Sequence, residues 1–376
     1  MALRRRRVAT LLRRLSRWAA YGIPFPGREP GKGLARGGEC VSWKEELPEV
    51  TQGRVKPLRY VNTDGTGPQT TSALLRWAIL DKLAGRRRKA PNRATVPSVA
   101  PDLALLSRPP GVGQGVRLTW LGHASWLVQV ASTSMLIDPV LGERISGVVR
   151  RNVSPGLRVG QLPKIDGCLV THNHYDHLDL PTLQQVGAPV WAGQGTGPLL
   201  RKAGLDAHEM RWWDTAQVGL ATVHFVPSQH WSRRGLFDVN EMLWGGFVVE
   251  GDGRRVHHAG DTAYFDGFAE IGRRFSGLDA TMLPIGAYDP PWFMEVQHLN
   301  PEQAARAFLD LGARNLLAMH WGTFKLTDEP LDEPPRRLAA EWARLALPER
   351  QLHILPVGGT WTAPGNVSLV KRAGPP

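Results

Sequence analysis

Cysteine is scarce in this sequence, and long apolar runs are absent. The 376 residues include only Cys40 and Cys168, and neither belongs to a Cys-x-x-Cys pair, which argues against a disulfide framework and is compatible with a reducing compartment. No apolar run reaches the roughly 18 residues that a membrane-spanning helix requires. With 42% hydrophobic and 21% charged residues, the composition is typical of a soluble globular protein. We therefore expect a cytoplasmic protein, with a peripheral position on a membrane as the open alternative.

Acidic residues are outnumbered, and the basic excess is concentrated at the N-terminus. There are 34 Asp and Glu residues against 46 Lys and Arg, a formal net charge of +12. Seven arginines lie within the first seventeen residues: Arg4, Arg5, Arg6, Arg7, Arg13, Arg14 and Arg17. Apolar residues recur among them at helical spacing: Val8, Leu11, Leu12, Leu15, Trp18 and Ala19. This pattern predicts an amphipathic helix on an anionic membrane surface, and a frayed terminus is the alternative.

The next hundred residues have the composition of an extension rather than of a core. Residues 20–70 are rich in Gly, Pro and Arg, and residues 86–102 have the composition of a linker. Between them, residues 70–85 predict a helix capped by Thr71 or Ser72 and ended by Gly85. We therefore divide the chain into a basic extension (1–110) and a globular domain (111–376).

Within the domain, short apolar strands alternate with helices. Strands are expected at 116–120, 125–130, 134–138, 167–171, 221–226, 244–250, 254–260 and 280–285. Helices are expected at 300–312, with Asn300 as cap and Gly312 as stop, and at 334–346. Several strands followed by a helix, in two successive rounds, predict an α/β sandwich built from two similar halves.

The stretch "THNHYDHLDLPTL" (171–183) concentrates metal-binding side chains directly after an apolar strand. His172, His174, Asp176 and His177 form the pattern H-x-H-x-D-H. Neutral imidazole and carboxylate are the ligands that zinc and its borderline neighbours accept. Because a catalytic zinc takes three protein ligands and a water, four candidates favour two adjacent ions.

Three further candidates lie where other apolar runs end. His230 follows "FVPSQ", Asp261 follows "VHHAG" and His320 follows "LLAM". Functional groups accumulate at such strand ends in open α/β sheets. Taken alone, each would more often be an ordinary loop residue, but together with the loop they complete two ligand sets.

These motifs resemble those of a known superfamily. H-x-H-x-D-H followed by single His, Asp and His residues at strand ends is typical of the metallo-β-lactamase superfamily, which implies a four-layer αββα sandwich with a binuclear site. Longer stretches resemble the family of N-acyl-phosphatidylethanolamine-hydrolysing phospholipases D: "SQHWSRRGLFDVNEMLWGGFVVE", "HAGDTAY", "LPIGAYDPPWFMEVQHLNPEQAARAFLDLG" and "MHWGTFKLTDEPLDEPP". The likeness covers roughly residues 116–350.

The resemblance implies a role for each matching residue. His172, His174 and His230 would hold one Zn²⁺, Asp176, His177 and His320 the other, and Asp261 would bridge them, with Fe or Mn as alternative metals. Asp138 would orient a ligand imidazole from outside the coordination sphere. The substrate-contact candidates are Tyr175, Gln297, His298 and Trp292, and for each of them a packing role is the alternative.

The reaction implied by the resemblance is a phospholipase D hydrolysis. Two zinc ions about 3.5–4 Å apart lower the pKa of a shared water, and the hydroxide attacks phosphorus in line. Asp261 and Asp176 are the catalytic candidates, and Asp261 would also orient the nucleophile or take its proton. The products would be phosphatidic acid and an N-acylethanolamine. The implied partners are the phospholipid substrate, an anionic membrane surface and a second copy of the chain in a homodimer.

Two other functions stay open. The first keeps the metal site and changes the substrate to another phosphodiester or a lactone. The second is a nucleic-acid-binding protein on a degenerate scaffold, which the charge of +12 would favour. Because all seven ligand positions are intact, this second function is disfavoured.

Overall fold

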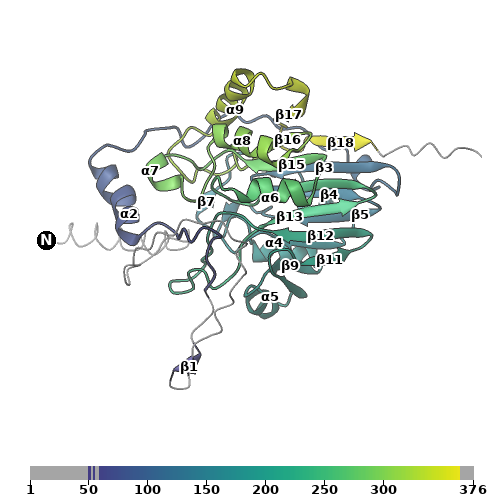
Figure 1. The fold of residues 1–376 in the computed structure, drawn as a ribbon, viewed down its shortest axis with the longest axis horizontal. Helices are drawn as coiled ribbons and strands as arrows, with labels where there is room; N and C mark the ends of the chain where they lie inside the picture. The colour runs from purple at the N-terminus through teal and green to yellow at the C-terminus, as the bar shows by residue number, and fades with distance from the viewer. Residues whose placement is uncertain (1–49, 52–53, 56–58, 365–376) are drawn as a thin grey trace, which may run out of the picture.

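The computed structural model describes residues 50–51, 54–55 and 59–364 (Figure 1). The amphipathic helix expected within residues 1–20 lies outside these described residues. The first described element is a small hairpin of β1 (Val50–Thr51) and β2 (Arg54–Val55).

Two seven-stranded sheets form the centre of the molecule. The first has the order β10-β9-β8-β5-β4-β3-β18 and the second β11-β12-β13-β14-β15-β16-β17. The strands of the first sheet are β3 (Gly115–Gly122), β4 (Ser125–Val130), β5 (Thr133–Ile137), β8 (Gly167–Val170), β9 (Val190–Gly193), β10 (Ala207–Met210) and β18 (Thr360–Pro364). Those of the second are β11 (Thr215–Val218), β12 (Ala221–Val226), β13 (Gly246–Gly251), β14 (Arg254–His258), β15 (Ala280–Pro284), β16 (Leu316–Met319) and β17 (Leu352–His353).

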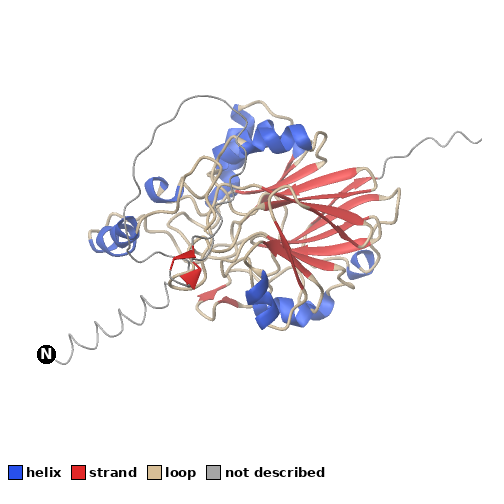
Figure 2. Ribbon diagram, turned by 60° about the horizontal axis from the view of Figure 1, so that its bottom comes forward, coloured by secondary structure: helices blue, strands red, loops and turns tan. Residues whose placement is uncertain are grey.

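Helices cover both outer faces of the paired sheets (Figure 2). The first sheet carries α4 (Leu180–Val186) and α5 (Gly197–Lys202), whose Leu183 and Leu200 pack in one apolar cluster with Cys168. The second carries α6 (Gly267–Arg274), α8 (Pro301–Leu311) and α9 (Glu333–Arg344). Phe308 and Trp342 of this layer belong to the large core that also fills the space between the sheets. The expected four-layer αββα architecture of two similar halves is confirmed.

Shorter elements lie in the connections. They are α2 (Thr71–Leu75), the π-helical turn η2 (Arg76–Asp81), α3 (Leu103–Leu106), the hairpin β6 (Arg144–Ile145) and β7 (Val149–Arg150), η3 (Val159–Gln161), α7 (Pro291–Met294) and η4 (Glu349–Gln351). The expected start of α8 is confirmed, because Asn300 and Gln303 form a reciprocal capping box and Gly312 ends the helix in the left-handed region. The expected cap of α2 is wrong by one residue: the extended Thr70 accepts the hydrogen bond of the Ala73 amide.

Residues 86–102, interpreted from composition as a linker, lie on the surface of the domain and contact it repeatedly. Arg88 donates to Glu333, the main chain of Ala94 exchanges two hydrogen bonds with the Asn152 amide, and Ser98 bridges Val357. These contacts attach the segment to the domain. The division of the chain at residue 110 stays a prediction.

Candidate metal centre

The strand ends of both sheets meet at one edge of the sandwich. β5 and β8 run parallel in the first sheet, and β14, β15 and β16 run parallel in the second. Parallel strands end at the same edge, so the residues that follow β5, β8, β14 and β16 are brought together. In chain order these are Asp138, the 171–179 loop, Asp261 and His320.

Three histidines converge with their ring nitrogens facing one another. His172 Nε2 lies 2.9 Å from His174 Nδ1, and His230 Nε2 lies 3.3 Å from the same atom. Burial lowers the pKa of His174 to about 4 and holds the pKa values of His172 and His230 well below the usual range. Neutral rings keep lone pairs available, so this trio has the chemistry of a three-histidine metal site.

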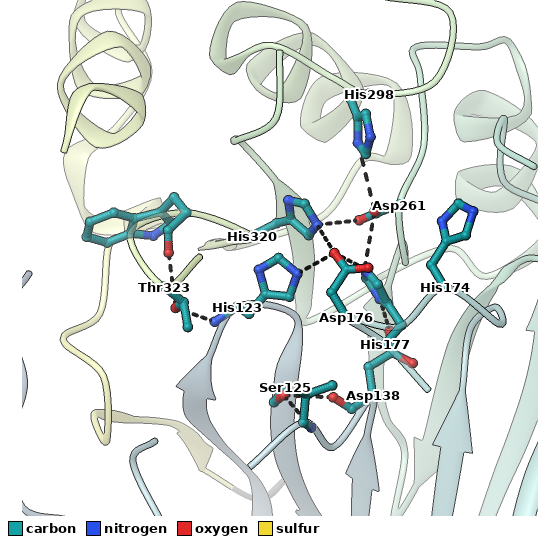
Figure 3. A network of polar contacts seen from close by, with 12 residues as sticks. His123, Ser125, Asp138, His174, Asp176, His177, Asp261, His298, His320 and Thr323 are labelled. Atoms are coloured by element: carbon teal, nitrogen blue, oxygen red, sulfur yellow. Dashed lines mark hydrogen bonds and ion pairs between the residues drawn. The ribbon is translucent and has the colours of Figure 1, made fainter. Parts of the chain in front are cut away.

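A second group, made of Asp176, His177 and His320, surrounds Asp261 (Figure 3). The Nε2 atoms of His177 and His320 each lie 3.7 Å from Asp176 Oδ2. Asp261 stands between the two rings, with Oδ2 3.2 Å from His177 Nε2 and Oδ1 3.1 Å from His320 Nε2. The candidate ligand atoms of Asp261, of His172 in the first group and of His177 in the second also lie within 4.8 Å of one another, so Asp261 has neighbours in both groups.

The charges of this second group depend on one another. Burial opposes protonation of His177, but the neighbouring carboxylates Asp261, Asp138 and Asp176 outweigh it and raise its pKa well above the usual range. Burial likewise opposes protonation of His320, but Asp261 and Asp176 raise its pKa to about 9. Burial alone would raise the pKa values of Asp176 and Asp261, yet the adjacent imidazoles lower both well below the usual range.

The unpaired state of several buried atoms, and not only the residue types present, indicates that this donor set fits a metal. His177 Nε2, His320 Nε2 and Asp261 Oδ1 are buried, and none makes a hydrogen bond of suitable geometry with any described residue. Buried polar atoms left in this state are costly, unless a cation coordinates them. These atoms lie on the sides of their groups that face one another, where a cation would be bound (Figure 3).

Outer contacts fix the orientation of the rings. Asp138, predicted to orient a ligand imidazole, accepts from His177 Nδ1 at 2.7 Å and from the Thr171 amide and hydroxyl at 2.8 and 2.7 Å. His230 Nδ1 donates to the Gln297 carbonyl at 2.9 Å. Such contacts set the tautomer and direction of a metal-binding ring.

His123, which was not predicted from the sequence, belongs to the same cluster. Its buried Nε2 lies 2.9 Å from Asp176 Oδ2, and its ring centroid lies 4.0 Å from that of His320. Burial, reinforced by His320, lowers the pKa of His123 to about 3, so the neutral ring donates to the carboxylate. The signal was present, because His123 follows an apolar strand in "LGHAS" just as His230, Asp261 and His320 follow theirs.

Several of these residues have unusual backbone conformations. His123, Asp138 and His320 have φ values of 55°, 45° and 63°, in the left-handed region. The His320 amide donates to the His123 carbonyl at 3.0 Å, and the His123 amide donates to Thr323 Oγ1 at 2.7 Å. Strained conformations persist where the surroundings hold them and cluster at functional sites.

A pocket with about 720 Å³ of empty space, part of it open to solvent, lies above the cluster. Its polar lining includes His174, Asp176, Asp261, Gln297 and His298. Its apolar lining includes Trp77, Trp231, Phe293, Met294 and Leu326. Burial lowers the pKa of His298 to about 4, and its Nδ1 lies 3.8 Å from Asp261 Oδ2.

The four predicted substrate contacts divide into two pairs. Gln297 and His298 line the pocket, as expected. Tyr175 does not line it, because its hydroxyl donates to the Arg234 carbonyl at 3.2 Å and the Arg234 guanidinium covers its ring. Trp292 does not line it either, because its ring lies under the guanidinium of Arg76, 4.2 Å away.

Known proteins are similar to this chain in sequence. Residues 133–321, which include all seven predicted ligands, match the family model described as "Beta-lactamase superfamily domain". An uncharacterized protein of Mycobacterium tuberculosis is 35% identical over 300 residues, which cover 76% of each chain. N-acyl-phosphatidylethanolamine-hydrolyzing phospholipase D 1 of Caenorhabditis elegans is 32% identical over 271 residues, which cover 66% of this chain and 76% of that protein.

A solved structure shares the fold. The isothiocyanate hydrolase from Delia radicum gut bacteria superposes with a TM-score of 0.55 at 21% identity, covering 66% of this chain and 99% of its own. At this level of identity the likeness extends to the architecture alone.

His123 yields a testable prediction for metal affinity. His123→Ala removes the hydrogen bond to Asp176, and we expect affinity for the second equivalent of metal to fall about 10–100-fold. His123→Gln keeps an N–H donor and should recover part of that loss. Metal content after dialysis against a competing chelator measures the effect, with the surface variant His208→Ala as control. Equal metal retention in His123→Ala and His208→Ala would contradict a positioning role.

The raised pKa of His320 predicts a pH dependence for the metal-free protein. The folded chain keeps a proton on His320 up to about pH 9, whereas an unfolded histidine loses it near its ordinary value of about 6.5. The protonated His320 therefore contributes fully to the free energy of unfolding below about pH 6.5. This contribution is lost as pH rises toward 9, by ~1.4 kcal/mol per pH unit. Urea unfolding of chelated wild type and His320→Gln should give slopes that differ by about this amount, and parallel curves would refute the prediction.

Proposed function

The chain belongs to the β-lactamase superfamily, in the branch of the N-acyl-phosphatidylethanolamine-hydrolysing phospholipases D, and is a metal-dependent hydrolase; from this premise we propose that it hydrolyses N-acyl-phosphatidylethanolamine to phosphatidic acid and an N-acylethanolamine. One observation carries the proposal. Eight His and Asp side chains form the cluster, and three of them, His174, Asp176 and Asp261, line a pocket that also has an apolar wall. A phosphodiester with a long acyl substituent matches both parts.

In the proposed site, His172, His174 and His230 would hold one ion, Asp176, His177 and His320 would hold the other, and Asp261 would be available to both. Two divalent ions, Zn²⁺ in our proposal with Fe or Mn as alternatives, would supply Lewis acidity for the phosphoryl group and make hydroxide available near neutral pH. Asp138 and Gln297 keep His177 and His230 in the tautomers that present Nε2 to the site.

The remaining steps belong to side chains of the pocket. Asp261 is a carboxylate and accepts hydrogen bonds, so it orients the attacking water toward phosphorus. His298 is neutral, lines the pocket beside Asp261 and presents a ring nitrogen to a phosphate oxygen. Gln297, whose Oε1 has no hydrogen-bond partner among the described residues, contacts the amide of the substrate.

Measuring both reaction products tests the proposed substrate. We expect purified, metal-assayed protein to convert N-acyl-phosphatidylethanolamine to phosphatidic acid and N-acylethanolamine by mass spectrometry, and a chelator to stop both. The double variant Asp176→Asn, His320→Ala should lose turnover to below detection with unchanged circular dichroism, whereas His208→Ala should not. Retained turnover in the double variant would overturn the two-metal site. Intact lipid with two metals bound would leave the hydrolase class standing and move the search to other phosphodiesters and lactones.

A lipid substrate also requires a surface that meets the membrane. Among the described residues, no helix is both long enough and apolar enough to cross a bilayer. The segment 71–86, which supplies Trp77 to the pocket, exposes Leu75, Leu80 and Leu83. Arg76, Lys82 and Arg86 are exposed along the same segment. Apolar and basic residues together favour an anionic lipid surface. We place the membrane contact here, beside the pocket mouth, with the basic N-terminal tail as a second contact.

Vesicle flotation tests this contact. The double variant Leu80→Gln, Leu83→Gln should lower binding to phosphatidylserine-containing vesicles by about tenfold, because two leucines no longer enter the lipid. Leu220→Gln is the matched control, since Leu220 is 64% exposed on the turn between β11 and β12. If both variants bind as wild type does, the membrane contact lies elsewhere.

A further inference from the structure

One wall of the pocket comes from a segment that the family model does not cover. Residues 59–88 precede the first strand of either sheet and lie outside the matched span 133–321. Gln69 and Trp77 of this segment nevertheless line the pocket together with Phe293 and Met294 of α7. Figures 1 and 2 show α2 beside α7 at one end of the molecule.

Trp77 is held in place by both apolar and polar contacts. Trp77 is 3% exposed, and its ring stacks on that of Phe293 at a centroid distance of 5.1 Å. Its Nε1 donates to Asp328 Oδ2 at 3.0 Å. Arg87 donates to both oxygens of Asp328, and its guanidinium lies 4.5 Å over the same indole. The orientation of the indole is therefore fixed by its contacts with Phe293 and Arg87 and by the hydrogen bond at its polar edge.

The segment is tied to α7 and to a predicted metal ligand as well. Gln69 Nε2 donates to the Phe293 carbonyl at 3.0 Å, which fixes α7 against the segment. Asn62 Nδ2 donates to the His230 carbonyl at 2.9 Å, and Asn62 Oδ1 accepts from the His230 amide at 3.1 Å. The same stretch of chain thus fixes the apolar wall and the peptide of His230.

We propose that residues 59–88 form a strap that completes the substrate pocket, and that Trp77 is the residue that selects for a long N-acyl chain. The inference rests on the proposed function for the identity of that chain. The head group lies at Gln297 and His298 above the metal ligands, and the chain lies along the pocket wall that Trp77, Phe293 and Met294 form together. Each methylene buried against this wall raises affinity about fourfold.

The test measures binding of the cleavage product, so it does not require turnover. N-acetyl-, N-butanoyl-, N-octanoyl- and N-dodecanoylethanolamine are titrated into the metal-loaded full chain by calorimetry. In wild type, affinity should rise with chain length. In Trp77→Ala, the octanoyl and dodecanoyl compounds should lose about tenfold in affinity, while N-acetylethanolamine changes less than about twofold. Trp361→Ala, a change to a partly buried tryptophan on the edge strand β18 outside the pocket lining, should bind all four compounds as wild type does.

Two further variants keep the test decisive if Trp77→Ala does not fold. Trp77→Phe keeps a ring on Phe293 and should retain most of the chain-length dependence, whereas Trp77→Leu should lose more of it. An equal loss for all four compounds, or equal chain-length dependence in every Trp77 variant, would overturn the strap. Trp77-dependent binding in a protein that leaves N-acyl-phosphatidylethanolamine intact would contradict the proposed function and support the strap. Cleavage of that lipid with an unchanged chain preference in Trp77→Ala would do the reverse.

Discussion

Three carboxylates, Asp138, Asp176 and Asp261, are enclosed within one cluster, and the structure around them depends on how their charge is balanced. Buried charge is costly unless it is paired and hydrogen-bonded. His177 and His320 supply positive charge in the metal-free chain, and the result is their raised pKa values. A divalent cation would displace those protons and satisfy the same oxygens, which couples metal binding to deprotonation.

The architecture places this cluster where neither half of the molecule could hold it alone. Asp138 and the 171–179 loop come from the first sheet, while His230, Asp261 and His320 come from the second. His123, which follows β3 of the first sheet, joins the halves twice at His320, through the contact between the two rings and through its carbonyl, which accepts from the His320 amide. Correct packing of the two sheets is therefore a condition for the site.

Local pattern was enough to predict much of the fold and of the cluster. The strands and α8 carry apolar runs and caps that determine their ends, and H-x-H-x-D-H brings four groups together within one short loop whatever the rest of the chain does. That His230, Asp261 and His320 would join them followed from the rule that functional groups lie at strand ends. The roles of His230, Asp261 and His320 as metal ligands stay predictions, and so does the role of Asp138 in orienting a ligand imidazole.

The direction of a side chain could not be predicted in the same way. Tyr175 and Trp292 lie in the matching motifs, but arginines from distant parts of the chain cover their rings and keep them out of the pocket lining. The contribution of residues 59–88 to the pocket could not be predicted from the sequence for a similar reason. Trp77 is held at the pocket by a hydrogen bond to Asp328, which lies 251 positions away in the sequence. No local sequence pattern predicts such a distant partner.

Anomalous X-ray diffraction from crystals of the metal-loaded protein, recorded at the absorption edge of the bound metal, tests the centre most directly. Two peaks are expected on either side of Asp261, one among His172, His174 and His230 and one among Asp176, His177 and His320. A single peak, or a second one away from Asp261, would contradict a binuclear site bridged by that carboxylate.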